Sequence, residues 1–268
     1  MKKVFSYLTL GIILLLLAMQ VSCVAAAGTN ATELDVFAAA SLTGAIVDLN
    51  KVFEAAHPGV HVMTNFDSSG TLETQIKEGA PADLFLPASD QNIQNLVKAK
   101  LLDNSSVTPY ATNKLAVIVP VDNPKGITGL ADLGKTGVKI VSEVSTVPVR
   151  KYTEQMLTKL SNDVDYGPVF VKRFKRNIIS EETNVAGATS KVALGAADAG
   201  VTYFSDVTKG LADQINVIEI PDKYNVVASY SAGIISESPH KDLAKEYIDL
   251  LKSEQGKTTL KDYKFSTV

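Results

Sequence analysis

Serine hydroxyls stand at two points of the chain where a strand-like segment changes into a helix-like segment. Ser41 follows the small apolar run VFAAA, and Ser68 and Ser69 follow VHVMTNFD. A serine at such a point is most often a helix N-cap, which is worth about 1 kcal/mol. It can also be a nucleophile or a ligand contact. Two hydroxyls beside Gly70 favour a ligand contact, because glycine permits close approach of the backbone.

Two further helix starts present backbone donors instead of hydroxyls. Val149 follows STVP, where Pro148 suits a first helical turn, and Val185 follows EETN, where Thr183 or Asn184 can serve as the cap. Helix N-termini carry unpaired N–H groups and the positive end of the helix dipole, so they attract anions. Ligands of open α/β sheets collect where strand ends meet helix starts. These junctions together therefore indicate an anion site.

The elements that must position these residues alternate along the chain. From Leu34 onward strand-like segments alternate with helix-like segments, which predicts a parallel-rich α/β fold. We expect two Rossmann-like lobes joined by two crossover strands. Lobe 1 comprises residues 34–112 and 225–268, and lobe 2 comprises residues 113–224. The stretch YNVVASYSAGIIS is long for a single strand, and we expect it to cross between the lobes.

One basic segment needs a separate interpretation. Residues 168–174, PVFVKRF, alternate like a strand, and the run VKRFKR could suggest a polyanion partner. With only four positive charges on an alternating segment, a solvated face is the better interpretation. The whole chain has a net charge of −3 and 46% hydrophobic residues, which is typical of a globular protein without a nucleic-acid partner.

The N-terminal residues have the pattern of a secretory signal. Lys2 and Lys3 precede the apolar run LTLGIILLLLAM. We expect residues 1–27 to be a signal or lipoprotein segment and residues 28–33 a tether. Cleavage after the following alanines, lipid attachment to Cys23 and an uncleaved anchor all remain open. Cys23 is the only cysteine, so the folded body has no disulfide and no thiol nucleophile.

Several motifs resemble one family of binding proteins. VFAAASLTGAI, NFDSSGTLETQIKEGAPADLFLPAS, VPVRKYTEQML and GVTYFSDV look like the extracytoplasmic molybdate-binding proteins of ABC importers, which have the type II periplasmic-binding-protein fold. The resemblance extends from Leu34 to the C-terminus. It implies hydroxyl contacts from Ser41 and Ser69, backbone N–H contacts from Val149 and Val185, and a phenol contact from Tyr203.

The resemblance also implies a function. The ligand would be molybdate or tungstate, with no other cofactor, and the partner would be an importer permease. The protein would be a monomer outside the cytoplasm, tethered to the membrane, and periplasmic if the cell has an outer membrane. The donor types agree, because hydroxyl and amide groups are neutral donors that suit a fully ionised oxyanion. Sulfate is such an ion too and remains an alternative.

Carboxylates near the predicted site allow a different coordination. Asp67, Glu182 or Asp206 could bind the metal directly, as in a related branch of oxyanion binders. We expect no direct metal ligand, because a carboxylate beside a dianion costs several kcal/mol unless it bonds the metal. These three residues are expected to cap helices or to face solvent.

Two rival functions remain to be weighed. The stretch SPHK matches the S-x-x-K signature of some serine hydrolases. Pro239 suits the first turn of a helix and Ser238 its N-cap, so we expect a structural role there and no enzyme activity. A surface adhesin without a ligand is the second rival, and it predicts no stabilisation by any oxyanion.

Overall fold

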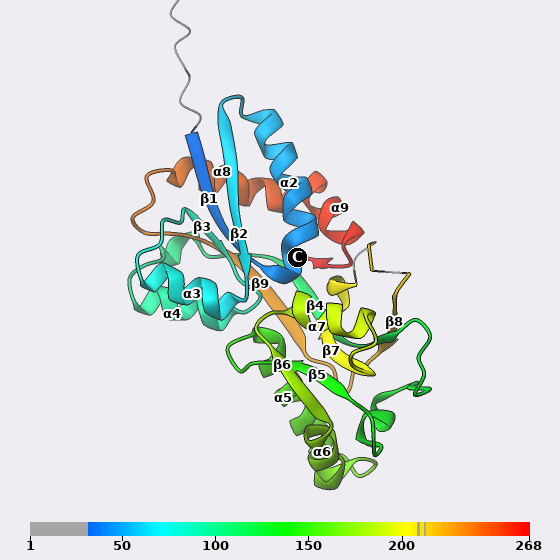
Figure 1. The fold of residues 1–268 in the computed structure, drawn as a ribbon. Helices are drawn as coiled ribbons and strands as arrows, with labels where there is room; N and C mark the ends of the chain where they lie inside the picture. The colour runs from blue at the N-terminus through cyan, green and yellow to red at the C-terminus, as the bar shows by residue number, and fades with distance from the viewer. Residues whose placement is uncertain (1–31, 208–209, 212) are drawn as a thin grey trace, which may run out of the picture. The chain divides into compact units, whose positions relative to one another are not determined.

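The computed structural model describes residues 32–207, 210–211 and 213–268 (Figure 1). The predicted signal segment, Cys23 and residues 28–31 of the predicted tether lie outside these residues. No helix of the described residues is long and apolar enough to cross a membrane. The strands are β1 (Thr32–Ala39), β2 (Val60–Asp67), β3 (Leu84–Leu86), β4 (Thr108–Pro120), β5 (Ile140–Glu143), β6 (Ile178–Glu182), β7 (Ala199–Tyr203), β8 (Ile215–Glu219), β9 (Val227–Ile234) and β10 (Ser266–Thr267).

Helices connect most of these strands, which confirms the predicted α/β class. The α-helices are α2 (Thr43–Ala56), α3 (Ser69–Lys77), α4 (Asp90–Lys98), α5 (Pro148–Ser161), α6 (Gly167–Arg176), α7 (Val185–Ala193), α8 (Lys241–Lys252) and α9 (Glu254–Asp262). Short 3-10 turns are η2 (Ala40–Leu42), η3 (Asn104–Ser106), η4 (Leu130–Gly134) and η5 (Phe204–Asp206).

Two long strands join the two ends of the sheet. The strand order is β2-β1-β3-β9-β4-β7-β5-β6, with β8 and β10 also paired to β4. Pairs β1–β2, β1–β3, β5–β6 and β5–β7 are parallel, whereas β4 and β9 run antiparallel to each other and to their other neighbours. The strands β4 and β9 are therefore the crossovers. Residues 32–268 form one compact unit, so the lobe boundaries stay a prediction.

Alternating side chains of the strands pack against helices on both faces of the sheet. Val36 and Leu84 face the cluster that contains α2 and α8, whereas Phe37 and Phe85 face α3 and α4. In the second half Ile140 packs toward α5 and α6, and its neighbour Val141 packs toward α7. This period of two, buried on both faces, is expected for a parallel sheet covered by helices. The C-terminal ends of β1, β2, β5 and β7 are thereby fixed next to helix starts.

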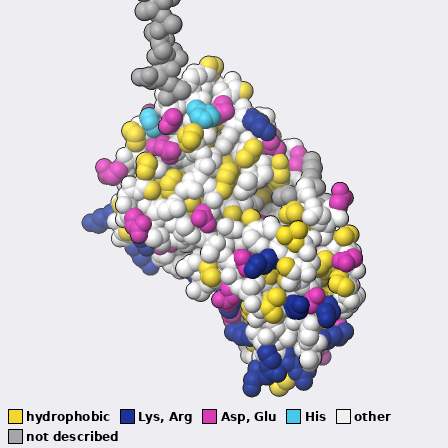
Figure 2. Space-filling model, in the orientation of Figure 1, with side chains coloured by type: hydrophobic (Ala, Val, Ile, Leu, Met, Phe, Trp, Pro, Cys, Tyr) yellow, Lys and Arg dark blue, Asp and Glu magenta, His cyan; other side chains and the backbone are white. Residues whose placement is uncertain are grey.

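The segment PVFVKRF is helical, so its prediction as a strand is wrong. It belongs to α6, whose Phe170 and Phe174 lie four residues apart and are both buried. That spacing places both rings on one helix face, and packing against α5 overrides the β-propensity of the valines. The basic side chains Lys172, Arg173 and Arg176 are exposed, and Figure 2 shows Lys and Arg gathered where α6 lies. The predicted solvated basic face is thus confirmed.

Candidate functional site

Four of the five predicted contact residues line one small pocket. Its volume is about 10 Å³, roughly what one buried water needs. An oxyanion with four oxygens is larger than one water, so groups that line the pocket must shift to admit it. The pocket is lined by Ala39, Ala40, Ser41, Asp67, Ser68, Ser69, Ala88, Val147, Pro148, Val185 and Tyr203.

The two adjacent serines have different tasks. Ser68 is the N-cap of α3, and its Oγ accepts a hydrogen bond from Thr71 N at 3.1 Å. Ser69 is 1% exposed, and its Oγ accepts a hydrogen bond from Ala88 N at 2.9 Å. Because Ala88 N–H uses a lone pair of Ser69, the proton of the Ser69 hydroxyl is left to donate. Ser68 therefore serves as the cap, while the hydroxyl of Ser69 keeps a proton available to donate.

Ser41 is not a helix cap. It lies in the 3-10 turn η2, and α2 begins after it with Leu42 at the N-cap and no side-chain cap. Its Oγ lies 3.0 Å from the hydroxyl of Tyr230 on the crossover strand β9. When Tyr230 donates to Ser41, the Ser41 proton is free for a ligand in the pocket. Tyr230 is a positioning residue that the sequence did not reveal, because it is 189 residues away in the chain.

Tyr203 carries a buried hydroxyl without a partner. The residue ends β7, its side chain is 1% exposed, and its phenol oxygen has no hydrogen-bond partner among the described residues. Edge-to-face contacts with Tyr152 and Tyr230, with ring centroids 6.3 Å and 6.0 Å away, hold the ring. Burial raises the pKa of this phenol well above 10, so it stays a neutral donor. A buried polar group of this kind needs an explanation.

The starts of α5 and α7 supply backbone donors. Asn184 caps α7 by accepting from Gly187 N at 3.0 Å, and the N–H of Val185 has no acceptor among the described residues. Pro148, the first residue of α5, lines the pocket. Val149 follows it, is fully buried and does not line the pocket, but its N–H also has no acceptor in the described part of the chain. Its contact with a ligand stays a prediction.

The pocket carries little charge of its own. Asp67 is the one charged residue that lines it, and Asp67 Oδ1 already accepts from Ser68 N at 2.6 Å. Glu182 forms an ion pair with Lys191, while Asp206 Oδ2 accepts from Tyr203 N at 2.8 Å. These contacts give each carboxylate a structural role. Apart from Asp67, a ligand in the pocket therefore meets neutral hydroxyl and amide donors.

Two carboxyl groups are buried behind Tyr203 and make stability depend on pH. Burial raises the pKa of Asp206 from 3.8 to about 7, and burial followed by repulsion from Asp206 raises the pKa of Glu143 well above its usual value. The folded protein therefore binds these protons more tightly than the unfolded chain. Through Asp206 the free energy of unfolding falls as pH rises from about 4 to about 7, and then levels off.

We expect Asp206→Asn to flatten this part of the pH profile. Urea unfolding at about pH 4.5 and about pH 8 measures the change in the free energy of unfolding over the window. The wild type should lose more stability than the variant between the two values. Because Asp206 also raises the pKa of Glu143, the difference between the two proteins reports the titration of Asp206 together with its coupling to Glu143. An equal loss in both would show that Asp206 titrates normally.

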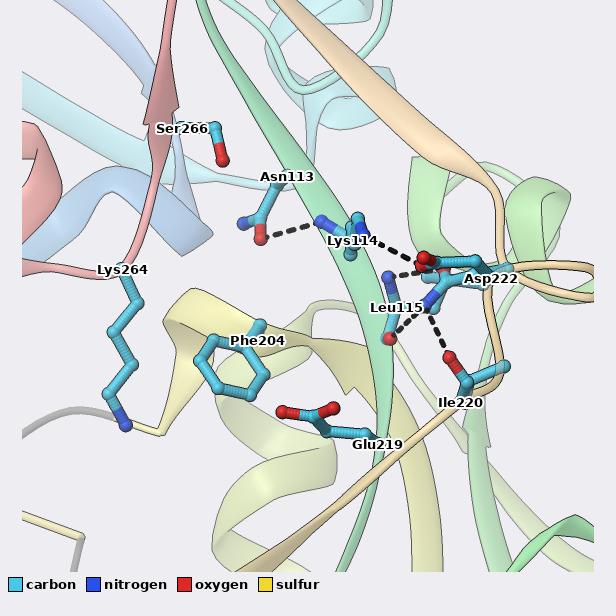
Figure 3. A pocket seen from close by; sticks show the side chains of 10 residues that line it. Asn113, Lys114, Leu115, Phe204, Glu219, Ile220, Asp222, Lys264 and Ser266 are labelled. Carbon is cyan, nitrogen blue, oxygen red and sulfur yellow. Dashed lines mark hydrogen bonds and ion pairs between the residues drawn. The ribbon is translucent and has the colours of Figure 1, made fainter.

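A larger pocket lies where β4 changes partners, and it suits a dianion less well. It has a volume of about 290 Å³ and is drawn in Figure 3. Lys114 pairs with Asp222 at 2.7 Å, and the amide of Asn225 bonds the backbone of Leu115. Glu219 also lines this pocket. Lys264 lines it as well, but the charge of Lys114 is offset by Asp222, and the two carboxylates Asp222 and Glu219 would repel an anion.

Comparison with known proteins gives the family. The family model described as bacterial extracellular solute-binding protein matches residues 34–266. The chain belongs to this family. Its members are extracellular, so the solute-binding protein acts outside the cytoplasm, as predicted.

Individual relatives support the assignment and the fold. The molybdate-binding protein ModA of Mycobacterium tuberculosis is 31% identical over 231 residues, which cover 86% of this chain and 83% of that protein. The periplasmic molybdate-binding protein of Azotobacter vinelandii has a TM-score of 0.73 at 23% identity, over 87% of this chain and 98% of that chain. The sulfate-binding protein SubI of Mycobacterium tuberculosis has a TM-score of 0.79 at 19% identity, over 88% and 87%. These structures confirm the type II periplasmic-binding-protein fold.

Proposed function

We propose that this solute-binding protein captures molybdate or tungstate between two lobes and delivers it to the permease of an ABC importer. The observation that carries the proposal is the phenol of Tyr203, which is buried, protonated and without an acceptor among the described residues. It lines the same pocket as the hydroxyls of Ser41 and Ser69 and as Val185. A small ion with several acceptor oxygens would satisfy all of these donors at once.

The donor set favours a fully ionised tetrahedral oxyanion. Hydrogen bonds to a charged group contribute about 1.5 to 3 kcal/mol each, so several neutral donors can hold a dianion without a lysine or arginine. Phosphate near neutral pH usually keeps a proton and needs an acceptor. The candidate acceptor, Asp67, lines the pocket and accepts from Ser68 N through Oδ1, so phosphate is included among the ions to be tested. Molybdate and tungstate have four unprotonated oxygens and fit the set.

The relatives support the same ligand. Proteins named for molybdate binding recur among them, including the 31% identical protein of Mycobacterium tuberculosis. The sulfate-binding protein shares the fold at 19% identity, and such a likeness reports the fold alone. Sulfate is the second candidate ligand because it is also a fully ionised tetrahedral dianion, and binding measurements must separate it from molybdate.

The remaining features of the function follow from this proposal. The protein makes and breaks no bond, it coordinates the metal through oxygens of the oxyanion alone, and it needs no further cofactor. The permease recognises a monomer whose N-terminus is tethered through lipid on Cys23 or through an uncleaved anchor. The capture step is a population shift toward a closed form in which donors of both lobes reach one ion.

The rival functions find less support. Ser238 is not the N-cap of α8, because that helix begins at Lys241 with His240 before it. The Ser238 hydroxyl instead donates to Asp83 Oδ1 at 2.5 Å and accepts from His240 N at 3.0 Å. Asp83 also accepts from Asp35 N at 2.8 Å. This serine ties the start of α8 to β1 and β3, which is a structural role rather than that of a hydrolase nucleophile.

A thermal-shift panel tests the proposed function. The protein is heated with molybdate, tungstate, sulfate or phosphate at equal ionic strength. A ligand that binds the native state stabilises it by about 2.7 kcal/mol at 100 times its Kd. We expect molybdate and tungstate to raise the melting temperature at micromolar concentrations. Stabilisation by sulfate but not by molybdate would contradict the ligand, and no stabilisation by any oxyanion would support a ligand-free adhesin.

A further inference from the structure

Gly70 makes an unusually close contact with the loop between β5 and α5. A Cβ atom at Gly70 would lie 2.5 Å from the carbonyl oxygen of Thr146 and 3.0 Å from Thr146 Cβ. The backbone angle φ of Gly70 is ordinary, so its conformation does not require glycine. The requirement comes from the approach of another backbone. Gly70 belongs to predicted lobe 1 and Thr146 to predicted lobe 2.

The contact lies at the edge of the candidate site. Gly70 directly follows Ser69, and Thr146 directly precedes Val147 and Pro148. Ser69, Val147 and Pro148 line the pocket. The same two segments therefore carry donors from opposite sides of the pocket. The distance between these two segments at the contact therefore fixes the distance that a ligand must bridge between their donors.

Neither side of the contact can yield easily. The touching atom of Thr146 is a backbone carbonyl, which cannot rotate away as a side chain can. Its loop is held by Val144 N, which donates to Glu182 O at 2.9 Å, and by Val147 N, which donates to Val144 O at 3.0 Å. On the opposite side the Ser68 cap and the Ser69 bond to Ala88 fix the start of α3.

Arg150 adds to the rigidity of the loop. Its Nη1 donates to Ser142 Oγ at 3.0 Å and to Glu143 O at 3.2 Å, and it pairs with Glu181 at 2.6 Å. The guanidinium thus ties the first turn of α5 to the ends of β5 and β6. The loop between β5 and α5 is thereby held at both of its ends.

We propose that the contact between Gly70 and Thr146 is the stop that limits lobe closure, and that it thereby sets the size of oxyanion the pocket accepts. This inference rests on the proposed function, because it assumes that an oxyanion is captured by closure. An added methyl group at position 70 would halt the lobes further apart. The donors would then reach a small ion less well than a large one.

The test compares Gly70→Ala with the wild type and with Gly129→Ala. Gly129 is a matched control, because its backbone is extended and a Cβ there would meet nothing within 4 Å. Calorimetry measures the Kd for molybdate and, by competition, for sulfate. Small-angle scattering measures the decrease in radius of gyration at saturating molybdate. The melting temperature without ligand reports on folding.

We expect Gly70→Ala to weaken molybdate binding about five- to hundredfold, the range for an overpacked contact. It should also contract less on binding and lose more affinity for sulfate, the smaller ion, than for molybdate. Without ligand it should melt at or above the wild-type temperature, since alanine favours the helix. Gly129→Ala should bind and contract like the wild type. If sulfate binds too weakly to measure, the Kd for molybdate and the change in radius of gyration decide the test.

Two results would overturn the stop. One is wild-type molybdate binding and contraction in Gly70→Ala. The other is a ligand-free melting temperature several degrees lower, because the contact would then belong to the fold at all times. Failure of the proposed function looks different, since the wild type itself would then bind none of the oxyanions.

Discussion

Replacing Tyr203 by phenylalanine should raise the Kd for molybdate about tenfold to a hundredfold while leaving the ligand-free protein at least as stable. The expected loss corresponds to one hydrogen bond to a charged group. Stability should not fall, because the phenol oxygen of Tyr203 is buried without a partner among the described residues. Removing an unsatisfied buried hydroxyl relieves a cost rather than breaking a bond.

Tyr110→Phe is the matched control for this prediction. Tyr110 lies in β4, is 1% exposed and likewise has no partner for its hydroxyl among the described residues, but it does not line the pocket. The same chemical change should therefore leave the Kd for molybdate unchanged. Calorimetry gives the Kd of each variant for molybdate, and urea unfolding gives the free energy of unfolding of each variant. Unchanged affinity in Tyr203→Phe would remove Tyr203 from the site.

Replacing Ser69 by alanine should weaken both binding and folding. The Kd for molybdate should rise about tenfold to a hundredfold, because the Ser69 hydroxyl no longer donates to the ion. The free energy of unfolding should fall by about 1 to 3 kcal/mol, because the buried N–H of Ala88 loses its acceptor. This pattern differs from that of Tyr203→Phe, in which only binding suffers.

Ser253→Ala separates the two effects in Ser69→Ala. Ser253 caps α9 by accepting from Gly256 N at 3.0 Å and does not line the pocket. Its loss should lower the free energy of unfolding by about 1 kcal/mol, as for other caps, without changing the Kd. If Ser253→Ala weakened molybdate binding as much as Ser69→Ala, general destabilisation would explain both and Ser69 would lose its assigned contact.

The order of strands and helices could be predicted because local patterns agree with the fold. Pro148 begins α5 and the HPG stretch ends α2, as their turn and cap chemistry requires. The exception is α6, where Val169 and Val171 suggest a strand. Four-residue spacing of Phe170 and Phe174 was the opposing signal, and packing decided in its favour.

The residues of the candidate site could be predicted where donors lie at strand ends. Contacts between segments far apart in the sequence could not be predicted. Ser41, Ser69, Val185 and Tyr203 all lie where a strand ends or a helix begins, so sequence position predicts that they share one pocket. The partner of Ser41 comes from β9, and no local pattern encodes a contact across the molecule. Ser41 also does not serve as the N-cap that a serine at such a position most often is, since a 3-10 turn delays the start of α2.

The most direct test of the central claim is to locate the ion. A crystal of the protein grown with molybdate, measured near the molybdenum absorption edge, gives an anomalous map in which molybdenum alone stands out. We predict one strong peak in the pocket between Ser41, Ser69 and Tyr203, with oxyanion oxygens within hydrogen-bond distance of all three hydroxyls. A peak in the larger pocket at β4, or a bound ion that leaves the Tyr203 hydroxyl unpaired, would contradict the account.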